Sequence, residues 1–308
     1  MICSYFDGRL GNQFFRYAFA RLVRYKRGDK DDLVFNFNNV INKGEENGFE
    51  DVLKYYNVLP YRTSNKNLIL QYGSFLQKCI YGFDRFVLSR LINVKTCSWR
   101  FKLLDKVGLI HSREDTGNTS FTITNCPTTF TSGKFEDPKY LDDIKQILQE
   151  EFIPKFELKK ENKELFEIIR NTNSVCITIR RGDYVSTQFK NDFFVCDKSY
   201  FNKGIEKIKE IIDNPTFVLF SDDIEWAKNN IIIEGYPVFY ESGNDPIWEK
   251  LRLMSSCKHF VISNSTFSWW AQYLCTNKDK KVVSPNKWFA NPNWVSYLIQ
   301  NDFIQINT

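Results

Sequence analysis

The carboxyl-terminal half of the chain alternates between strand-like and helix-like hydrophobic patterns, and this alternation restricts its fold more than any other feature. The expected strands cover 175–179, 216–220, 238–240 and 260–262, and the expected helices cover 162–170, 200–212, 224–230, 246–255 and 267–274. Strands that alternate with helices build a parallel sheet whose faces are covered by the helices. We therefore predict an α/β domain with a parallel sheet here.

The amino-terminal half opens with the same order of strand and helix. A strand is expected over 1–6, a turn over 7–11 and a helix over 12–25, because apolar side chains recur at helical spacing in the last segment. Between about 35 and 132 the chain is rich in Asn and Lys with short aromatic runs, and we expect irregular structure there. A further helix, expected over 135–155, leads into the second half.

The length of 308 residues fits two domains of roughly 150 residues each. We place the boundary just after Pro154, which gives the domains 1–155 and 156–308. Hydrophobic residues make up 43% of the chain, enough for a sizeable core. Aromatic residues make up 16%, which fits either core packing or a surface on which sugars stack.

The charge of the chain separates it from nucleic-acid-binding proteins. Its 42 basic and 37 acidic residues give a formal charge of +5, without the clustered basicity of such proteins. Anionic small molecules suit this balance better, and no nucleic-acid partner is predicted. Because no window approaches the ~20 apolar residues that span a bilayer, and no leader is recognisable, we expect a cytoplasmic protein.

One basic cluster lies in and just after the helix expected over 12–25. It comprises Arg16, Arg21, Arg24, Lys26 and Arg27. Two interpretations are open for it. We favour a solvated helix face, and the alternative is peripheral contact with the anionic inner surface of a membrane.

Thiols and imidazoles do not form a recognisable metal motif. The eight cysteines are widely spaced and include no C-x-x-C pair, so we expect reduced and mostly buried thiols. His111 and His259 are the two histidines of the chain, which leaves few ligands for zinc. No metal site is predicted.

Three polar loops follow expected strands of the second half. They are Arg180-Arg181-Gly182-Asp183, Ser221-Asp222-Asp223 and Ser263-Asn264-Ser265-Thr266. In a parallel α/β sheet, ligands bind outside the carboxyl ends of the strands. We therefore expect the three loops to face the same crevice.

The residue types in these loops suit a ligand that carries phosphate. A guanidinium offers a rigid fork of donors that matches phosphate oxygens, and the start of a helix presents backbone N–H groups to an anion. Structural explanations are also open, because arginines can leave a core at a strand end and Ser, Thr or Asp can cap a helix. Asp222 or Asp223 could instead orient Arg180 or a sugar hydroxyl.

Two common nucleotide-binding motifs do not occur in the sequence. Neither G-x-x-x-x-G-K-S/T nor G-x-G-x-x-G is present, which disfavours a P-loop NTPase and a dinucleotide dehydrogenase. A sugar nucleotide remains as a candidate ligand. A fixed arginine can, without a metal, stabilise the negative charge that grows on a departing diphosphate.

Four motifs occur in an order that is typical of one family. They are Gly8-Arg9-Leu10-Gly11-Asn12-Gln13-Phe14-Phe15-Arg16-Tyr17-Ala18, Ile179-Arg180-Arg181-Gly182-Asp183-Tyr184, Phe220-Ser221-Asp222-Asp223-Ile224-Glu225-Trp226, and the segment 253–270 with Ser263-Asn264-Ser265-Thr266-Phe267 at its centre. Over nearly its whole length, the chain resembles the bacterial α-1,2-fucosyltransferases of glycosyltransferase family 11.

The resemblance implies a fold and an activity. The fold would be α/β of the GT-B type, with two Rossmann-like domains facing across a cleft and parallel sheets flanked by helices. Domain 1–155 would lie on the acceptor side and 156–308 would bind the GDP-sugar. The activity implied is inverting, metal-independent transfer of L-fucose from GDP-β-L-fucose to the 2-OH of a galactoside, in a galactose-terminated oligosaccharide or a lipid-linked glycan, with no cofactor.

The resemblance also assigns roles to single residues. Arg180 would stabilise the β-phosphate, Asn12 would reach the donor from the other domain, and Asp222 completes the expected catalytic set. The expected donor-binding residues are Gly11, Arg181, Asp183, Ser221, Asp223, Glu249, Asn264, Ser265, Thr266 and Phe267. Arg181 is expected to anchor Asp183 or the domain structure. Asp222, Asp223 and Asp183 are the candidates for a general base, and the acceptor could instead lose its proton late, to phosphate or water.

Two positions depart from the family pattern. Thr178 stands where the family has His, and Glu249-Lys250 stands where an acidic pair is usual. Because of these two departures, a donor other than GDP-fucose, with another GDP-linked sugar, is an open alternative. A catalytically silent protein that binds a glycan or a nucleotide on the same fold is the alternative from a different functional class.

Overall fold

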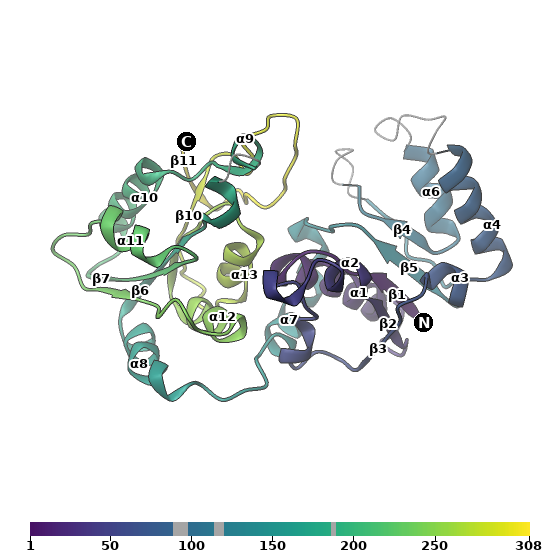
Figure 1. Ribbon diagram of the computed structural model, residues 1–308, viewed down its shortest axis with the longest axis horizontal. Coiled ribbons are helices and arrows are strands. Elements are labelled where there is room, and N and C mark those ends of the chain that lie inside the picture. The colour runs from purple at the N-terminus through teal and green to yellow at the C-terminus, as the bar shows by residue number, and fades with distance from the viewer. Residues whose placement is uncertain (89–97, 114–119, 186–188) are drawn as a thin grey trace. The chain divides into compact units, whose positions relative to one another are not determined.

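The computed structural model describes residues 1–88, 98–113, 120–185 and 189–308. Within this part the chain divides into two compact units, Met1–Phe152 and Ile153–Thr308. Figure 1 labels their helices and strands.

Unit 1 is built on a five-stranded parallel sheet with the order β3-β2-β1-β5-β4. The strands are β1 (Ile2–Tyr5), β2 (Leu33–Asn36), β3 (Tyr61–Thr63), β4 (Leu109–His111) and β5 (Thr129–Ser132). The α-helices are α1 (Leu10–Lys26), α2 (Asn38–Ile41), α3 (Leu68–Tyr72), α4 (Phe75–Phe83), α6 (Ser98–Lys106) and α7 (Lys145–Glu151). A π-helical turn, Asp84–Leu88, continues α4, and short 3-10 turns cover Glu45–Asn47, Leu53–Tyr55, Pro138–Tyr140 and Asp142–Ile144.

Two expectations for this half were wrong. The middle of the chain is not irregular, because it supplies β3, β4 and β5 of the sheet. These strands have only three or four residues each, too few to show the alternation by which a strand is recognised. The single helix expected over 135–155 is instead two 3-10 turns followed by α7, and these bring the same apolar side chains to the core.

Unit 2 is built on a six-stranded parallel sheet with the order β11-β10-β9-β6-β7-β8. The strands are β6 (Asn173–Ile179), β7 (Pro215–Ser221), β8 (Val238–Tyr240), β9 (His259–Val261), β10 (Val282–Pro285) and β11 (Ile304–Ile306). The α-helices are α8 (Lys163–Asn171), α9 (Lys190–Phe193), α10 (Lys198–Ile211), α11 (Ile224–Asn230), α12 (Ile247–Ser256) and α13 (Thr266–Leu274), with 3-10 turns at Lys160–Asn162 and Gly182–Val185. All strands and helices expected here are confirmed. The elements β10, β11 and α9 were not predicted from the sequence.

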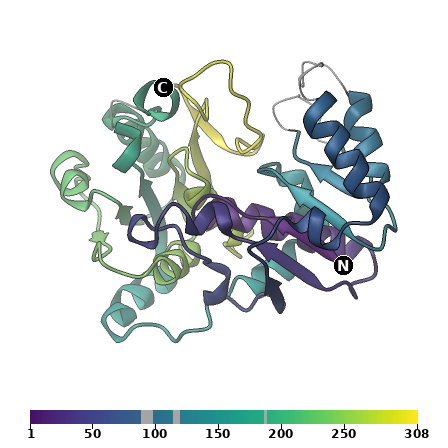
Figure 2. The same ribbon diagram turned by 45° about the vertical axis from the view of Figure 1, so that its right-hand side comes forward.

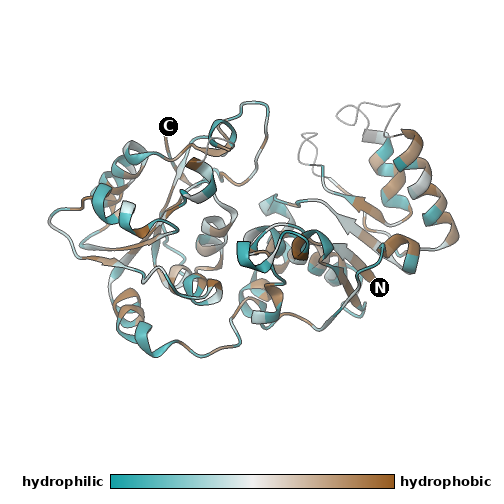
Figure 3. Ribbon diagram, in the orientation of Figure 1, coloured by the Kyte–Doolittle hydropathy of each residue, from teal (hydrophilic) through white to brown (hydrophobic). Residues whose placement is uncertain are grey.

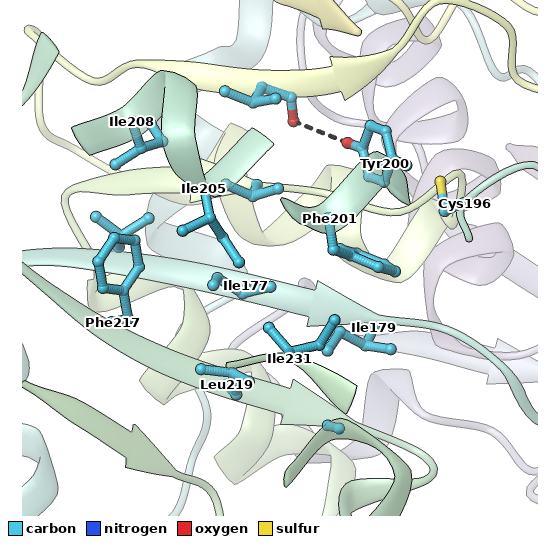
Figure 4. Packing of buried hydrophobic residues seen from close by; sticks show 14 of the residues in the cluster. Ile177, Ile179, Cys196, Tyr200, Phe201, Ile205, Ile208, Phe217, Leu219 and Ile231 are labelled. Atoms are coloured by element: carbon cyan, nitrogen blue, oxygen red, sulfur yellow. Dashed lines mark hydrogen bonds between the residues drawn. The ribbon is translucent and has the colours of Figure 1, made fainter. Parts of the chain in front are cut away.

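A buried apolar cluster joins α10 to the sheet of unit 2 (Figure 4). Ile177 of β6 and Leu219 of β7 face Phe201 and Ile205 of α10, and all four side chains are buried. Each such side chain contributes roughly 1.5–3 kcal/mol on removal from water. The hydroxyl of Tyr200 also donates a hydrogen bond to the carbonyl oxygen of Ile262, at 2.5 Å. This packing fixes the strands whose carboxyl ends carry the polar loops.

In each sheet, the strand that comes first in the sequence lies between two later strands, and the chain continues to one side of it and then to the other. In unit 2, β6 pairs with β7 on one side and with β9 on the other. In unit 1, β1 lies in the same way between β2 and β5. Ligands of doubly wound sheets bind at such a switch point, outside the carboxyl ends of the strands. The loops after β6 and β9 therefore occupy the expected position of a ligand site in unit 2.

The basic cluster of α1 is only in part the solvated face that we favoured, because two of its five side chains are buried. Arg16 and Arg21 are buried, and Arg21 Nε lies 2.8 Å from Glu151 Oε1. Further ion pairs join Arg21 and Arg24 to Asp29 and Arg27 to Asp31. The guanidiniums hold α1 to its neighbours instead of facing a partner.

Free thiols occur at seven cysteines of the described residues, and five of these thiols are buried. They are Cys3, Cys79, Cys126, Cys176, Cys196, Cys257 and Cys275. Burial raises the pKa of the Cys3 thiol to about 12, so it stays protonated at neutral pH. Cys97 lies outside the described residues.

Both histidines are expected to make the protein less stable in mild acid. Burial lowers the pKa of His111 and of His259 below the ordinary value of an imidazole. The unfolded chain takes up protons at about pH 6.5, before the folded chain does, so stability is complete above that pH and is lost as pH falls through it. By calorimetry, we expect the Tm to fall by a few °C between about pH 7.5 and 5.5.

A double variant tests this assignment. His111→Gln with His259→Gln removes both titrating groups, and its Tm is expected to fall less over the same interval than that of the parent. An equal fall in the two proteins would show that other groups cause the acid sensitivity.

Candidate functional site

The carboxyl end of β6 carries the first polar loop of unit 2 to the edge of the sheet. The strand is buried from Ser174 to Ile179, and the exposure of the chain rises at Arg180, where the strand ends. The backbone N–H of Arg180 donates to Ser263 Oγ at 3.0 Å. This bond joins the loop after β6 to the loop after β9 across the switch point, so the two loops lie together as predicted.

Two carboxylates from different loops hold the guanidinium of Arg180. Its Nη1 lies 2.6 Å from Asp222 Oδ2, and its Nη2 donates to Asp183 Oδ1 at 2.6 Å. The ring of Tyr184 lies 5.5 Å from the guanidinium carbon. The prediction that one aspartate of the second loop orients Arg180 is therefore confirmed for Asp222. A guanidinium fixed in this way is preorganised for an anion.

Gly182 is needed for the contact between Asp222 and Arg180. A Cβ atom built on Gly182 would lie 2.6 Å from Asp222 Oδ2 and 3.7 Å from the Arg180 guanidinium carbon. No side chain therefore fits beside the carboxylate while it keeps this position. The glycine serves a close approach between two loops, and its own φ is not positive.

Arg181 points to a different set of partners from Arg180. Its Nε donates to Asp223 Oδ2 at 3.3 Å, and its guanidinium carbon stacks 3.8 Å from the ring centre of Trp226. Successive side chains of an extended segment point to opposite sides, which separates the two arginines. Of the two alternatives expected for Arg181, the structure shows anchoring of the domain and not of Asp183, which binds Arg180. Arg181 instead anchors the start of α11.

The second loop, after β7, is organised by its own side chains. Ser221 Oγ donates to the carbonyl oxygen of Ile179 at 3.1 Å and accepts from the N–H of Asp223 at 2.9 Å. Asp223 also caps α11 by accepting from the N–H of Trp226 at 3.2 Å. The capping explanation is thus confirmed for Asp223.

Asp222 is engaged at both of its carboxylate oxygens. Oδ1 accepts from the N–H of Arg181 at 2.8 Å, and Oδ2 pairs with Arg180. A general base needs a free oxygen within about 3 Å of the proton it takes. The geometry therefore favours Asp222 as a residue that positions Arg180, and it disfavours the catalytic-base role considered from the sequence.

The third loop is held to β6 by Ser263 and Thr178. Ser263 Oγ donates to the carbonyl oxygen of Thr178 at 2.6 Å, and the N–H of Ser263 donates to Thr178 Oγ1 at 3.2 Å. Thr178 is buried. At this departure from the family pattern, a threonine hydroxyl thus joins the strand to the loop. Ser263 was missed as a site residue because only the pairing of β6 with β9 brings it to Arg180.

Asn264 supports the loop from inside the unit. Its Nδ2 donates to the carbonyl oxygens of Phe193 and Trp288, both at 2.8 Å, and its Oδ1 accepts from the Cys196 thiol. Only 2% of Asn264 is exposed. Every polar atom of its side-chain amide thus has a partner within the fold, and the donor-binding role expected for Asn264 stays a prediction.

The beginning of α13 follows directly on this loop. Ser265 is the N-cap residue but makes no side-chain capping hydrogen bond, so the capping explanation does not account for its hydroxyl. Thr266 and Phe267 form the first turn of the helix and are half-buried. The first-turn N–H groups and the positive end of the helix dipole lie at the same sheet edge as Arg180.

Glu249 lies within the fold, and its expected donor-binding role stays a prediction. The carboxylate is fully buried and accepts from the N–H of Lys159 at 2.9 Å and from Asn162 Nδ2 at 3.2 Å. It also pairs with Arg252 at 2.6 Å. Glu249 thus fixes the segment before α8 against α12.

A fourth loop, after β8, adjoins the three that were predicted. Lys250 Nζ reaches back from α12 to the carbonyl oxygen of Gly243 at 2.8 Å and to Glu241 Oε1 at 3.2 Å. A Cβ atom on Gly243 would lie 3.6 Å from Ile224 at the start of α11. The second departure from the family pattern therefore has a local role, because Lys250 neutralises a buried carboxylate that follows β8.

In unit 1 the glycine loop lies at the corresponding switch point. Gly8 has a φ of +79°, a conformation that favours glycine, whereas Gly11 lies in the first turn of α1 and is buried. Gln13 Nε2 donates to the carbonyl oxygen of Gly8 at 2.9 Å. Asn12 Nδ2 donates to Glu136 Oε1 at 2.8 Å, which joins the segment after β1 to the segment after β5.

The described ranges contain neither a cluster of metal-ligating side chains nor a helix that could span a membrane. No group of three or more His, Cys, Asp or Glu side chains there is arranged to hold a metal ion. Among the helices of those same ranges, none combines the length and the apolar character needed to cross a bilayer.

Comparison with known proteins shows the relationship of the chain. The model of glycosyl transferase family 11 matches residues 1–295. The O-antigen biosynthesis glycosyltransferase WbnK of Escherichia coli is 28% identical over 306 residues, covering 94% of this chain and 95% of the relative. The alpha-1,2-colitosyltransferase of Escherichia coli is 31% identical over 299 residues, covering 94% and 93%.

Solved structures show the same fold at low sequence identity. NodZ alpha-1,6-fucosyltransferase soaked with GDP-fucose aligns with a TM-score of 0.50 and 10% identity, covering 92% of this chain and 94% of that one. A mutant of Arabidopsis thaliana FUT1 in complex with GDP aligns with a TM-score of 0.53 and 14% identity, covering 93% and 71%. The fold is of the GT-B type, with two Rossmann-like domains whose parallel sheets are flanked by helices. With the family model matched from residue 1 to residue 295, the chain belongs to glycosyl transferase family 11.

Proposed function

We propose that the protein is an inverting galactoside α-1,2-fucosyltransferase with GDP-β-L-fucose as its donor. One observation carries the proposal: Arg180 is fixed between Asp183 and Asp222 at the switch point of unit 2, beside the start of α13. Fixed guanidinium and helix N–H groups at one sheet edge suit a diphosphate. The 1,2 linkage in the name of the colitosyltransferase relative supports the linkage, and the GDP-fucose in the NodZ structure supports the donor.

The proposed reaction is a single displacement at the anomeric carbon of fucose. The bond from this carbon to the β-phosphate oxygen breaks, and the acceptor 2-OH oxygen forms its bond from the opposite face, which inverts the configuration. The sugar passes through a transition state with oxocarbenium character. Arg180 stabilises the charge that grows on the departing phosphate. The acceptor proton leaves late, to phosphate or water, since Asp183, Asp222 and Asp223 each already pair with an arginine.

The remaining residues would bind the substrates. Ser265, Thr266 and the first-turn N–H groups of α13 would hold the diphosphate, and Asn12 of unit 1 would contact the donor. The acceptor would be a galactose-terminated oligosaccharide or a lipid-linked glycan. We propose that no metal takes part, because the fixed guanidinium fork of Arg180 and the N–H groups that begin α13 supply hydrogen-bond donors for the departing phosphate.

Transfer of another GDP-linked sugar is the second candidate. Lys250 stands where an acid is usual, and the relative that is 31% identical is a colitosyltransferase. Colitose is fucose without its 3-hydroxyl, so both donors would present the same diphosphate and the same leaving group. A pocket that hydrogen-bonds the 3-hydroxyl would prefer fucose, because a buried partner left without that hydroxyl is costly.

A donor and acceptor panel tests the proposal. The purified protein is incubated with GDP-fucose, GDP-colitose or GDP-mannose and with oligosaccharides ending in galactose, and the linkage of each product is determined by NMR. We expect a 1,2-linked fucosyl product with inverted configuration, and equal turnover in EDTA. Preference for another donor would replace the fucosyl assignment by the second candidate. Binding of GDP without turnover across the panel would contradict the enzymatic assignment, and loss in EDTA restored by Mn²⁺ would contradict metal independence.

A further inference from the structure

The outer faces of α4 and α6 in unit 1 expose large apolar side chains. Phe75 is 85% exposed, Phe83 53%, Phe86 62% and Trp99 53%. Leu70, Leu76, Val87 and Leu103 are exposed beside them. The hydropathy colouring in Figure 3 shows apolar residues along both helices. We name this surface, on α4, its π-helical continuation and α6, the α4/α6 face.

The α4/α6 face points away from the core because the opposite sides of both helices are already packed. Ile80 and Tyr81 of α4 and Leu104 of α6 join the same apolar cluster over the sheet, together with Leu109 and Phe130 of β4 and β5. The two helices lie side by side in both views (Figure 1 and Figure 2). Their outer sides therefore form one surface, not two separate ones.

Helical periodicity gives the face its apolar character. In α4 and its continuation the exposed aromatic residues are Phe75, Phe83 and Phe86, at spacings that keep them on one side of the helix. In α6 the exposed Trp99 and Leu103 are four residues apart. An ordinary surface helix carries its apolar stripe toward the core alone. These two helices carry a second one toward the outside.

The charges on the α4/α6 face are all of one sign. Within residues 75–88 and 99–106, the exposed or half-buried charged side chains are Lys78, Arg85, Lys102 and Lys106. The acids of the same segments are buried: Asp84 binds Arg100, with Oδ2 to Nη2 at 2.8 Å, and Asp105 pairs with Arg113. An apolar surface that displays basic residues and conceals its acids is complementary to an anionic surface.

Helices of unit 2 provide the contrast. Three lysines of α10 and α11 are each paired with an acid three residues away. The pairs are Lys207 with Glu210, Lys209 with Glu206, and Lys228 with Glu225, each at 2.8 Å. Exposed acids of this kind do not occur within residues 75–88 and 99–106 of the α4/α6 face.

We propose that the α4/α6 face docks the protein onto a lipid bilayer that contains anionic headgroups. Trp and Phe side chains enter the boundary between headgroups and acyl chains, while Lys and Arg remain at the headgroup level and attract anionic lipid. This combination of exposed aromatic and basic residues is the one that an interfacial helix presents to a membrane. The charge pattern selects a bilayer over a second copy of the chain, because two such faces would repel each other.

Vesicle sedimentation tests the docking surface. The full chain is mixed with vesicles of phosphatidylethanolamine and phosphatidylglycerol, or of phosphatidylcholine alone, and the pelleted fraction is measured at low and high salt. We expect binding to the anionic vesicles that weakens as salt rises, and little binding to phosphatidylcholine. Absence of binding to anionic vesicles at low salt would overturn the proposal.

Two variants assign the binding to this face. Phe75→Ser with Phe83→Ser and Phe86→Ser removes the aromatic side chains and is expected to abolish sedimentation. Lys102→Gln with Lys106→Gln is expected to weaken binding on the order of 30-fold, about fivefold for each charge. Unchanged binding in both variants would overturn the assignment.

Matched controls separate docking from folding and from self-association. Lys203→Gln with Lys278→Gln removes two exposed lysines of unit 2, and Ile232→Ser removes an exposed apolar side chain of that unit. Both are expected to sediment like the parent. All variants are checked by circular dichroism and by light scattering. Loss of a dimer in the aromatic variant, without any vesicle binding in the parent, would assign the face to a second copy and overturn the proposal.

Discussion

Replacing Arg180 by alanine is expected to lower the rate of sugar transfer on the order of 10²-fold or more while the protein stays folded. The guanidinium is held by Asp183 and Asp222, each at 2.6 Å, so it is already oriented when a phosphate arrives. Alanine removes the charge and the donors together. The side chain is 26% exposed at a sheet edge, so its loss creates no cavity in the core.

The measurement compares kcat, KM and Tm of three variants with those of the parent. Arg170→Ala, on the exposed end of α8, is the control for loss of a surface arginine and is expected to behave like the parent. Arg180→Lys keeps the charge but loses the planar fork, and its rate is expected to lie between those of the parent and Arg180→Ala. Near-normal turnover of a folded Arg180→Ala protein would refute the role of this residue in transfer.

Gly182→Ala is expected to lower kcat/KM on the order of 10-fold or more with little change in Tm. The new Cβ atom would lie 2.6 Å from Asp222 Oδ2, and the atom that must move is the end of a flexible side chain. The steric cost is therefore small, but the displaced oxygen is the one that orients Arg180. A misplacement of about 1 Å at a positioned group is enough for a loss of this size.

Gly82→Ala is the matched control for this variant. Gly82 lies within α4, and a Cβ atom there meets nothing within 4 Å. Alanine at this position is expected to raise stability by about 0.5–1 kcal/mol through helix propensity and to leave turnover unchanged. If Gly182→Ala retained full kcat/KM, the contact between Asp222 and Arg180 would not matter for transfer.

Long strands were predicted correctly from the sequence, and short strands were not. β6 and β7 have seven residues each and are buried over most of their length, so their hydrophobic runs identified them. β3 and β4 have three residues each, and both lie in the segment that was expected to be irregular. Packing on neighbouring strands stabilises such short strands, and their own residues carry no detectable pattern.

The residue types of the loops indicated a site for a phosphate group, but they did not indicate which side chains face that site. Arg180 and Ser265 were expected from their loops, and the structure brings those loops together. Asn264 and Glu249 come from equally typical motifs, yet both are buried with their polar atoms satisfied by the fold. The direction of a side chain depends on which partners are near in three dimensions, and a motif does not contain that information.

The residues of the chain, read alone, were enough to identify an α/β architecture, the polar loops at strand ends and the resemblance to one family. Those features follow from local hydrophobic periodicity and from residues adjacent in the chain. The tertiary structure added the pairing of β6 with β9, by which Ser263 meets both Thr178 and Arg180. Strand order depends on contacts between residues about 85 positions apart, where no local pattern operates. For that reason only the folded chain shows that the site lies at a switch point.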